Sequence, residues 1–518
     1  MTRFLGMRGN RLNLVALCGV TMPALMSFGY NQVLLGGVLT LRSFNDQFPE
    51  IDIANAAPSD KQRVSVIQGT VVALYAIGGL FGALLCIGLG DILGRRRVIM
   101  VASVLQLLGV VLMGSAYSFA HLIVSRIILG LGIGGLMATA PVWQSEISPA
   151  AKRGTHVVTT GLFGGIGGTI ALFLDLGMSF APGTVGWRFP FVFQALFPLM
   201  SIVIICFLPE SPRWLIRQNR VGEARDVLAA LESIDPNHPK VDAEIKDVQS
   251  SLRLTGEGSL RQVFHMGPQR ALHRAFISVA AMSFLQLTGV NVITFYTTTI
   301  FETYLELGSI MSRVLAAVYQ SVALIGGTLC IFTVEGFGRR NLMLAGAAGN
   351  TICLALVAGL GSQPLNQTAI HAAVAFIFLY HFSFIVGFAG VPILYATEIA
   401  PLKMRGTING LSLGFFWAFC VLIAEITPIA FEAIGWRLFI IFAAVNLAIV
   451  GVVYLFFPET AGHTLEEIDE IFVSSTTIWD PVWVAKRLAQ STGEKLQTQK
   501  DLKEEQSDVK VGELCNEH

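Results

Sequence analysis

Long apolar runs separated by short polar segments dominate this chain of 518 residues. About twelve runs are long enough, at roughly 20 residues each, to cross a bilayer as helices whose backbone hydrogen bonds are made within the segment. The pattern predicts an all-α membrane protein with twelve transmembrane helices. The expected spans are 12–37, 68–90, 98–117, 121–143, 157–180, 189–208, 271–304, 309–334, 343–360, 370–396, 410–431 and 438–457.

The polar segments between these runs occur in two copies, about 250 residues apart. DILGRRRV at 91–98 is matched by EGFGRRNL at 335–342, and EISPAAKRG at 146–154 is matched by EIAPLKMRG at 398–406. The repeat predicts two pseudo-symmetric six-helix halves, at 12–208 and 271–457. Membrane proteins built from parallel halves usually bind their ligand between the halves near the bilayer midplane, so transport is the leading hypothesis.

Composition agrees with a membrane location, because 53% hydrophobic residues, 14% charged residues and a mean hydropathy of +0.64 are too apolar for a soluble protein of this length. The zero net charge gives no reason to expect a nucleic-acid partner. Six of the seven cysteines lie within apolar runs without metal-ligand spacing, so we expect no metal site and no cofactor. The sequence places no nucleophile and base together at a plausible site, so we do not expect an enzyme.

Three polar segments complete the chain: an amino-terminal segment at 1–11, a linker at 209–270 and a tail at 458–518. Helical spacing of Val221, Ala224, Leu228 and Leu231 predicts short surface helices in the linker. After about residue 488 the tail lacks apolar residues to fold around, and we expect disorder there. We expect the chain to function as a monomer.

Lysine and arginine concentrate in the same segments and in the repeated polar loops. The positive-inside rule then places both termini in the cytoplasm, and the plasma membrane is the expected location. A sequon at Asn366 falls in a short outer turn close to the membrane, so we interpret it as a chance match rather than a glycosylation site.

Glycine-rich stretches at 130–135 and 161–168 lie inside apolar runs. A phosphate-binding loop would need a preceding strand and a soluble nucleotide pocket. Small residues within apolar helices instead allow neighbouring helices to pack closely, and we favour this interpretation.

Six motifs in the expected order give the chain a resemblance to a known family. They are the two acid-to-GlyArgArg loops, PVWQSEISPAAKRG at 141–154, PESPRWLIRQNRVGEA at 209–224, QLTGVNVITFY at 286–296 and PETAGHTLEEID at 458–469. Over about 12–472 the chain resembles the sugar porter family of the major facilitator superfamily, and in particular its fungal members. The resemblance implies alternating access to a sugar or sugar-like substrate.

Acids and arginines at the helix ends on one side of the membrane can form ion pairs between neighbouring helices. The resemblance implies that such pairs hold the outward-facing state and separate when the inside opens. Solvated loop charges that only set topology are the alternative. The expected network comprises Asp91, Arg95, Glu146, Arg153 and Glu210 in the first half and Glu335, Arg339, Glu398, Arg405 and Glu459 in the second.

Arg126 lies well inside a span, where an ionisable side chain is costly and normally faces a cavity or a partner. Proton-coupled members of the resembled family carry an Asp where this chain has Asn31. Asn cannot titrate, so the resemblance favours passive uniport, with a proton-coupled symporter as the alternative if Asp175 or Glu425 supplies the proton. Both acids lie toward outer span ends, where we expect solvated structural carboxylates.

The family's sugar-contact positions are matched in part. Gln286 and Asn291 match its sugar-binding Gln and Asn. Tyr296 matches the following aromatic residue and Trp417 a pocket tryptophan, and Asn31 completes the predicted substrate-binding set. Five positions depart: Leu285 and Gly161 replace Gln, Ala323 and Phe416 replace Asn, and Ile393 replaces Trp.

Lost polar partners favour a less polar substrate, because an unpaired buried hydroxyl costs about 1 to 3 kcal/mol. A polyol, a deoxy or aromatic-conjugated sugar or another small metabolite fits such a pocket. The alternative that other residues replace the lost contacts, so that a hexose is still carried, stays open. A non-transporting nutrient sensor is the alternative from another class, although family sensors tend to have longer tails. A multidrug exporter would suit the apolar pocket but not the sugar-porter loops.

Overall fold

The computed structural model describes residues 3–148, 153–255, 263–267, 269–363 and 365–488. These residues contain helices and no strand. The amino-terminal half comprises α1 (Gly9–Ala16), α2 (Met22–Val38), α3 (Arg42–Asn45), α4 (Lys61–Leu93), α5 (Arg95–Gly114), α6 (Phe119–Ile147), α7 (Arg153–Met178), α8 (Val185–Phe193) and α9 (Leu196–Ile205).

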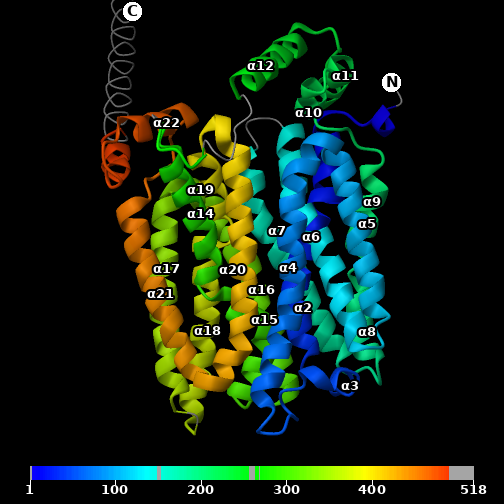
Figure 1. The fold of residues 1–518 in the computed structure, drawn as a ribbon, viewed down its shortest axis with the longest axis vertical. Helices are drawn as coiled ribbons and strands as arrows, with labels where there is room; N and C mark the ends of the chain where they lie inside the picture. Colours follow the sequence, from blue (N-terminus) through cyan, green and yellow to red (C-terminus); the bar gives the residue numbers. More distant parts are fainter. Residues whose placement is uncertain (1–2, 149–152, 256–262, 268, 364, 489–518) are drawn as a thin grey trace, which may run out of the picture.

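The linker folds as α10 (Pro212–Arg217), α11 (Val221–Glu232) and α12 (Pro239–Thr255). The carboxy-terminal half comprises α14 (Ala271–Leu287), α15 (Val290–Thr299), α16 (Ser309–Phe337), α17 (Arg339–Gly361), α18 (Gln367–Phe388), α19 (Val391–Ile399), α20 (Arg405–Ile434) and α21 (Leu438–Phe456), followed by α22 (Leu465–Ser474). Figure 1 shows two helical bundles side by side, with α10, α11, α12 and α22 at one end, called here the linker end, and α3 at the other. The disorder expected after residue 488 lies outside the described residues.

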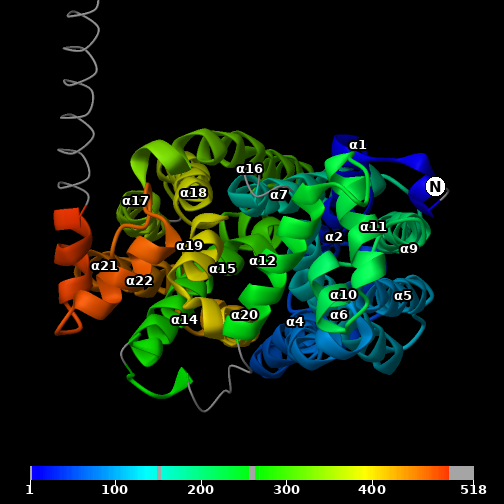
Figure 2. The same cartoon turned by 90° about the horizontal axis from the view of Figure 1, so that it is seen from above.

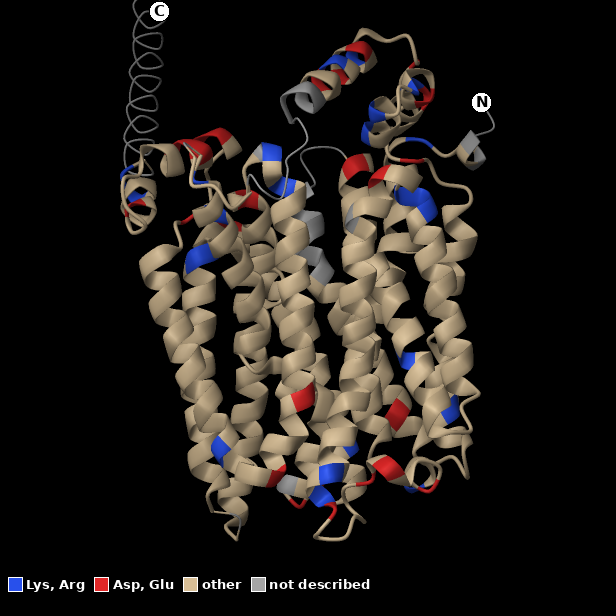
Figure 3. Ribbon diagram, in the orientation of Figure 1, with Lys and Arg blue, Asp and Glu red and all other residues tan. Residues whose placement is uncertain are grey.

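Eleven helical segments of the described chain are long and apolar enough to cross a membrane. The last, Arg405–Phe456, holds both α20 and α21 with a 3₁₀ turn between them, so the twelve-helix prediction agrees with the fold. Figure 3 shows the acidic and basic residues gathered at the two ends of the bundle, with few in the apolar middle. This distribution is the one that a bilayer requires.

Three expected spans are interrupted rather than continuous. The span predicted at 271–304 breaks between α14 and α15, where Gly289 adopts φ +90°. A side chain there would be strained and would also meet the ring of Phe442. The break frees the carbonyl of Thr288, which accepts hydrogen bonds from Tyr380 Oη at 3.1 Å and Asn446 Nδ2 at 2.9 Å.

The other two breaks separate α8 from α9 and α18 from α19. Continuous apolar character in the sequence did not reveal these breaks, because side-chain hydropathy carries no information about backbone dihedrals. The break between α14 and α15 matters most for function, since the predicted sugar-contact residues Gln286 and Asn291 stand on either side of it.

Close helix contacts at glycine confirm the packing interpretation of the glycine-rich stretches. A Cβ at Gly134 would lie 2.0 Å from the carbonyl oxygen of Gly79, so α6 and α4 approach backbone to backbone. Gly167 of α7 lies equally close to the carbonyl of Met26 in α2. Across the seam between the halves, α4 packs along α20 and α7 along α16, as seen from above in Figure 2.

Candidate functional site

A charged cluster at the linker end of the amino-terminal half joins three helices. The Arg95 guanidinium pairs with Asp91 at 3.1 Å and with Glu146 at 3.2 Å. Arg217 of α10 lies 2.7 Å from the other Asp91 oxygen and so ties the linker to the end of α4. The structure therefore brings the predicted Asp91, Arg95 and Glu146 together.

The carboxy-terminal half repeats this arrangement. Arg339 pairs with Glu335 at 2.8 Å and with Glu398 at 3.0 Å. Glu398 also accepts a hydrogen bond from the Thr460 hydroxyl at 2.7 Å. The Arg339 side chain is more deeply buried than that of Arg95, so removing one partner of this pair should cost more, about 3 to 5 kcal/mol for a fully buried pair.

Glu210 and Glu459 act as matched caps on the two polar loops. Glu210 accepts a hydrogen bond from the backbone N–H of Arg96 at 3.1 Å, and Glu459 accepts one from the N–H of Arg339 at 2.8 Å. Each caps the first turn of a helix, where N–H groups have no partner within the helix. Burial raises the pKa of Glu210, against the opposing effect of the Ser211 and Arg96 N–H groups and the Arg95 charge.

The glycine before each basic pair is required by this capping. Gly94 and Gly338 adopt φ +90° and +85°, and a Cβ at either position would meet the capping carboxylate. The repeated acid-to-GlyArgArg motif thus supplies a turn and an ion pair, and its glycine leaves room for the capping carboxylate of Glu210 or Glu459.

Two further arginines, Arg153 and Arg405, belong to the predicted network. The Arg153 side chain lies outside the described residues. Arg405 donates to the carbonyl of Ala400 at 3.5 Å and interacts electrostatically with Asp469 and Glu398. Sequence reasoning missed Arg274, a buried arginine that pairs with Asp469 at 2.6 Å and donates to the carbonyl of Ile399 at 2.6 Å. An arginine four residues into an apolar run was the available signal.

The predicted substrate contacts lie on both sides of the break in the seventh span. Asn291 Nδ2 donates to Gln286 Oε1, and Gln32 Nε2 of the other half donates to Asn291 Oδ1 at 3.4 Å. Gln286 and Asn291 are both buried, and Gln286 Nε2 has no hydrogen-bond partner among the described residues. An amide pair with a free donor at the seam can bind a hydroxyl group.

Aromatic residues surround this amide pair. Trp417 packs edge-on against Phe28 at 5.8 Å between centroids and against Tyr75 at 6.1 Å, so both halves contribute to the cluster. The indole Nε1 of Trp417 is buried without a hydrogen-bond partner in the described chain. Tyr296 is directed elsewhere, because its hydroxyl donates to the carbonyl of Ala424 at 3.1 Å.

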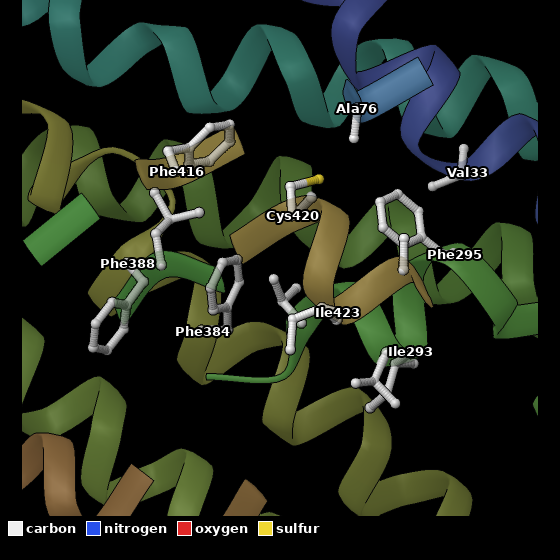
Figure 4. Close-up of a cluster of buried hydrophobic side chains, with 14 of the residues drawn as sticks. Val33, Ala76, Ile293, Phe295, Phe384, Phe388, Phe416, Cys420 and Ile423 are labelled. Atoms are coloured by element: carbon white, nitrogen blue, oxygen red, sulfur yellow. The ribbon is translucent and has the colours of Figure 1, made fainter. Parts of the chain in front are cut away.

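Apolar side chains fill the rest of the region, and Figure 4 shows Cys420 of α20 with Phe416 on one side of it and Ala76, Val33 and Phe295 on the other. The small replacements Gly161 and Ala323 bring the halves together. A Cβ at Gly161 would lie 3.0 Å from the Ala389 carbonyl, and one at Gly165 would lie 3.0 Å from Ala323 Cβ. Positions that carry amides in the resembled family are close helix contacts here.

Arg126 obtains its partners from the backbone. Its Nε donates to the carbonyl of Val71 at 2.7 Å and its Nη2 to that of Val72 at 3.1 Å, and its guanidinium lies 5.5 Å from the Tyr75 ring centroid. Asn31 is buried and donates to the carbonyl of Ser27 in its own helix at 2.9 Å. The guanidinium is therefore stabilised without a carboxylate.

The expectation that Asp175 is solvated is wrong. Asp175 is 2% exposed, and neither carboxylate oxygen has a hydrogen-bond partner among the described residues. It lies against Gly37 of α2 and within electrostatic reach of Arg313 of α16. Helix α2 covers it, which its place near the end of a span did not indicate. Glu425 is half-buried and accepts a hydrogen bond from Thr70 at 2.7 Å.

Arg313 joins the two halves near the α3 end. It donates to the carbonyl of Gly37 at 2.8 Å and to the Thr40 hydroxyl at 2.6 Å. With Glu425 and Thr70, this contact forms a polar closure between the halves on that side. Sequence analysis did not single out Arg313, because its role depends on a helix 273 residues away.

Two homologous helical halves, a broken helix at their seam and matched charge clusters at one end define a multi-pass membrane transporter of the major facilitator class. The family described as Sugar (and other) transporter matches residues 16–472. The chain belongs to this family.

Known proteins are similar to this chain along most of its length. Sugar transporter STL1 of Saccharomyces cerevisiae is 33% identical over 462 residues, covering 88% of this chain and 80% of the relative. High-affinity glucose transporter ght5 of Schizosaccharomyces pombe is 31% identical, with 91% and 87% covered. The proton:xylose symporter XylE, bound to 6-bromo-6-deoxy-D-glucose, shares the fold with a TM-score of 0.74 at 22% identity, covering 89% of this chain and 98% of that one.

Neutralising either central arginine of the charge clusters should impair transport more than expression. We expect Arg95→Gln and Arg339→Gln to release the helix ends they join, to favour the state open at the linker end, and to lower the transport rate about tenfold, with the larger effect at the more buried Arg339. Radiolabelled uptake normalised to surface protein measures this. Arg97→Gln removes an exposed charge from the same helix and serves as the control. Wild-type rates in both variants would contradict a role of these ion pairs in holding the linker end closed.

Removing either amide of the seam pair should weaken substrate binding. Gln286→Ala and Asn291→Ala each delete a hydrogen-bonding group that a desolvated hydroxyl needs, so the apparent KM should rise about 5-fold or more. Concentration-dependent uptake measures the change. Thr351→Ala is the control, because that hydroxyl donates to its own helix at Ala347. An unchanged KM in both amide variants would mean that the substrate binds elsewhere.

Loss of the Arg313 contact should open the α3 end. With Arg313→Gln, the donors to Gly37 and Thr40 are weakened, and the halves should separate more often on that side. Spin labels at Arg42→Cys and Glu432→Cys, in a cysteine-free background, would report a longer distance between halves. A distance distribution identical to that of the unsubstituted pair would show that Arg313 does not hold this closure.

Proposed function

We propose that this chain carries a sugar, a polyol or a related small metabolite across the plasma membrane by alternating access, as a monomer and by facilitated diffusion. In this proposal both termini face the cytoplasm. The observation that carries the passive mechanism is the pairing of Arg126 with two backbone carbonyls, while Asn31, at the position where proton-coupled members of the resembled family carry an Asp, cannot titrate. A guanidinium already satisfied in this way needs no proton-binding acid to complete it.

The surroundings of the amide pair support a substrate with fewer hydroxyls to satisfy than a hexose has. Gln286, Asn291 and Trp417 offer hydrogen-bonding groups, whereas Leu285 and Phe416 offer none. A small polyol could place its hydroxyls on the amides and its carbon chain against the aromatic rings. The names of the relatives, which include sugar and glucose transporters, support a hexose as the competing substrate.

A panel of labelled sugars, polyols and small acids, offered to cells that lack their own hexose carriers, tests the substrate class. Polyol uptake exceeding hexose uptake would support the proposal, and hexose uptake alone would support the competitor. Binding or signalling without uptake of any compound would instead support the nutrient sensor.

Proton-coupled symport is the second candidate, and the burial of Asp175 at the seam favours it. This carboxylate, on α7, lies against Gly37 of α2 in its own half and within electrostatic reach of Arg313 on α16 of the other half, so the transport cycle would change its surroundings. A buried acid between two moving halves could bind a proton in one state and release it in the other. Glu425, bonded to Thr70 across the same seam, is the next carboxylate to consider.

Uptake should follow the substrate gradient if the passive mechanism holds. We expect little change on adding a protonophore and a weak dependence between about pH 5 and 7, because no carboxylate contacts Arg126 in the part of the chain that the structure describes. Asn31→Asp should introduce such a group and make uptake sensitive to pH. Accumulation against the gradient that collapses with protonophore would overturn uniport, and loss of this accumulation in Asp175→Asn, with exchange retained, would identify the coupling acid.

A further inference from the structure

The described chain ends in a short helix at 480–488, beyond the family motifs. Its start is fixed by Asp480, whose carboxylate accepts hydrogen bonds from the backbone N–H groups of Thr476 at 2.8 Å and Thr477 at 2.7 Å. Arg270, just before α14, donates to the carbonyl of Thr477 at 2.6 Å. The segment is therefore held against the bundle at the linker end.

This helix has one face on the protein and one face away from it. Pro481 and Ala485 are buried, and Val484 and Leu488 pack against the main hydrophobic core. The outward stripe follows the spacing i, i+4, i+7 and i+8, which places its members on the same side of a helix. It consists of Trp483, Lys486 and Arg487 on the helix and of Trp479, the residue directly before its first turn.

The two tryptophans on this stripe are unusually open for their size. Trp479 is 44% exposed and Trp483 is 60% exposed, and Ile478 just before them is 42% exposed. Lys486 and Arg487 are exposed one turn further along. A stripe of large aromatic side chains bordered by basic residues is typical of helices that lie in a membrane interface.

The position of the helix identifies what covers this stripe. Trp479 stacks on Phe456, the last residue of α21, with ring centroids 4.3 Å apart. The neighbouring Tyr454 and Leu455 are exposed on the outer surface of the same apolar span, the surface that lipid covers in a membrane. Figures 1 and 2 show this short helix, in red, outside α21 at the edge of the bundle. The stripe thus continues the lipid-facing surface of α21 to its linker end.

We propose that residues 478–488 form an interfacial anchor in the leaflet at the linker end. Trp479 and Trp483 lie at headgroup level, where an amphipathic ring can bury its apolar edge and keep its N–H in a polar layer. Lys486 and Arg487 contact the phosphates of anionic lipids. In the orientation proposed above this leaflet is the cytoplasmic one, whose anionic lipids attract basic segments beside a span.

Brominated lipids test the placement of Trp483 in the full-length protein. In vesicles containing phosphatidylcholine brominated near the headgroup, we expect Trp483→Phe to lose part of the quenchable tryptophan fluorescence. Trp214→Phe is the matched control, because Trp214 is buried in the linker cluster and its removal should leave the quenched signal unchanged. An equal quenched signal in wild type and Trp483→Phe would overturn the proposal.

Hydrogen exchange of residues 476–488 tests whether the proposed anchor depends on the charge of the lipid. Exchange should be slower in vesicles that contain phosphatidylserine than in phosphatidylcholine alone, and the double variant Lys486→Gln with Arg487→Gln should remove this difference while uptake stays unchanged. Arg97→Gln is the control for a general loss of positive charge at the linker end. Protection that grows with protein density, without lipid quenching, would assign the stripe to a second copy of the chain and overturn the anchor.

Discussion

A helix in hydrocarbon must find a protein partner for every backbone polar group that the helix itself does not satisfy, and this constraint shapes the whole bundle. The break after Thr288 is possible because Tyr380 and Asn446 both donate to the freed carbonyl. Arg126 and Arg313 likewise bind backbone carbonyls of neighbouring helices. Each such contact fixes which helices are neighbours as well as satisfying a polar group.

The duplicated charge clusters make contacts within each half, and the seam makes contacts between the halves. Within each half, the pairs around Arg95 and Arg339 hold helix ends in place at the linker end. The polar contacts described between the halves, by contrast, include Arg313 with Thr40 and Glu425 with Thr70 near the α3 end. A protein that moves one half against the other must break the contacts between its halves in each cycle, and the hypothesis for the pairs around Arg95 and Arg339 is that they are released when the linker end opens.

The two halves are similar in fold but no longer equivalent in chemistry. At the start of the first span, Asn13 accepts hydrogen bonds from Gln144 and Ser148, all neutral groups. At the start of the seventh span, Arg274 pairs with Asp469 instead. The predicted substrate amides and the helix break also belong to one half, so the site is asymmetric although the scaffold is repeated.

Apolar run lengths by themselves determined the twelve spans, and the duplicated loops determined the two halves, because hydrophobic thickness and helix capping are properties of local sequence. The ion pairs of Arg95 and Arg339 could also be predicted, since their partners recur at matching places in both repeats. Tertiary structure alone decided the burial of Asp175, the contact of Arg313 with α2 and the helix break at Gly289. Each of these depends on a helix distant in sequence or on a backbone dihedral, and hydropathy records neither.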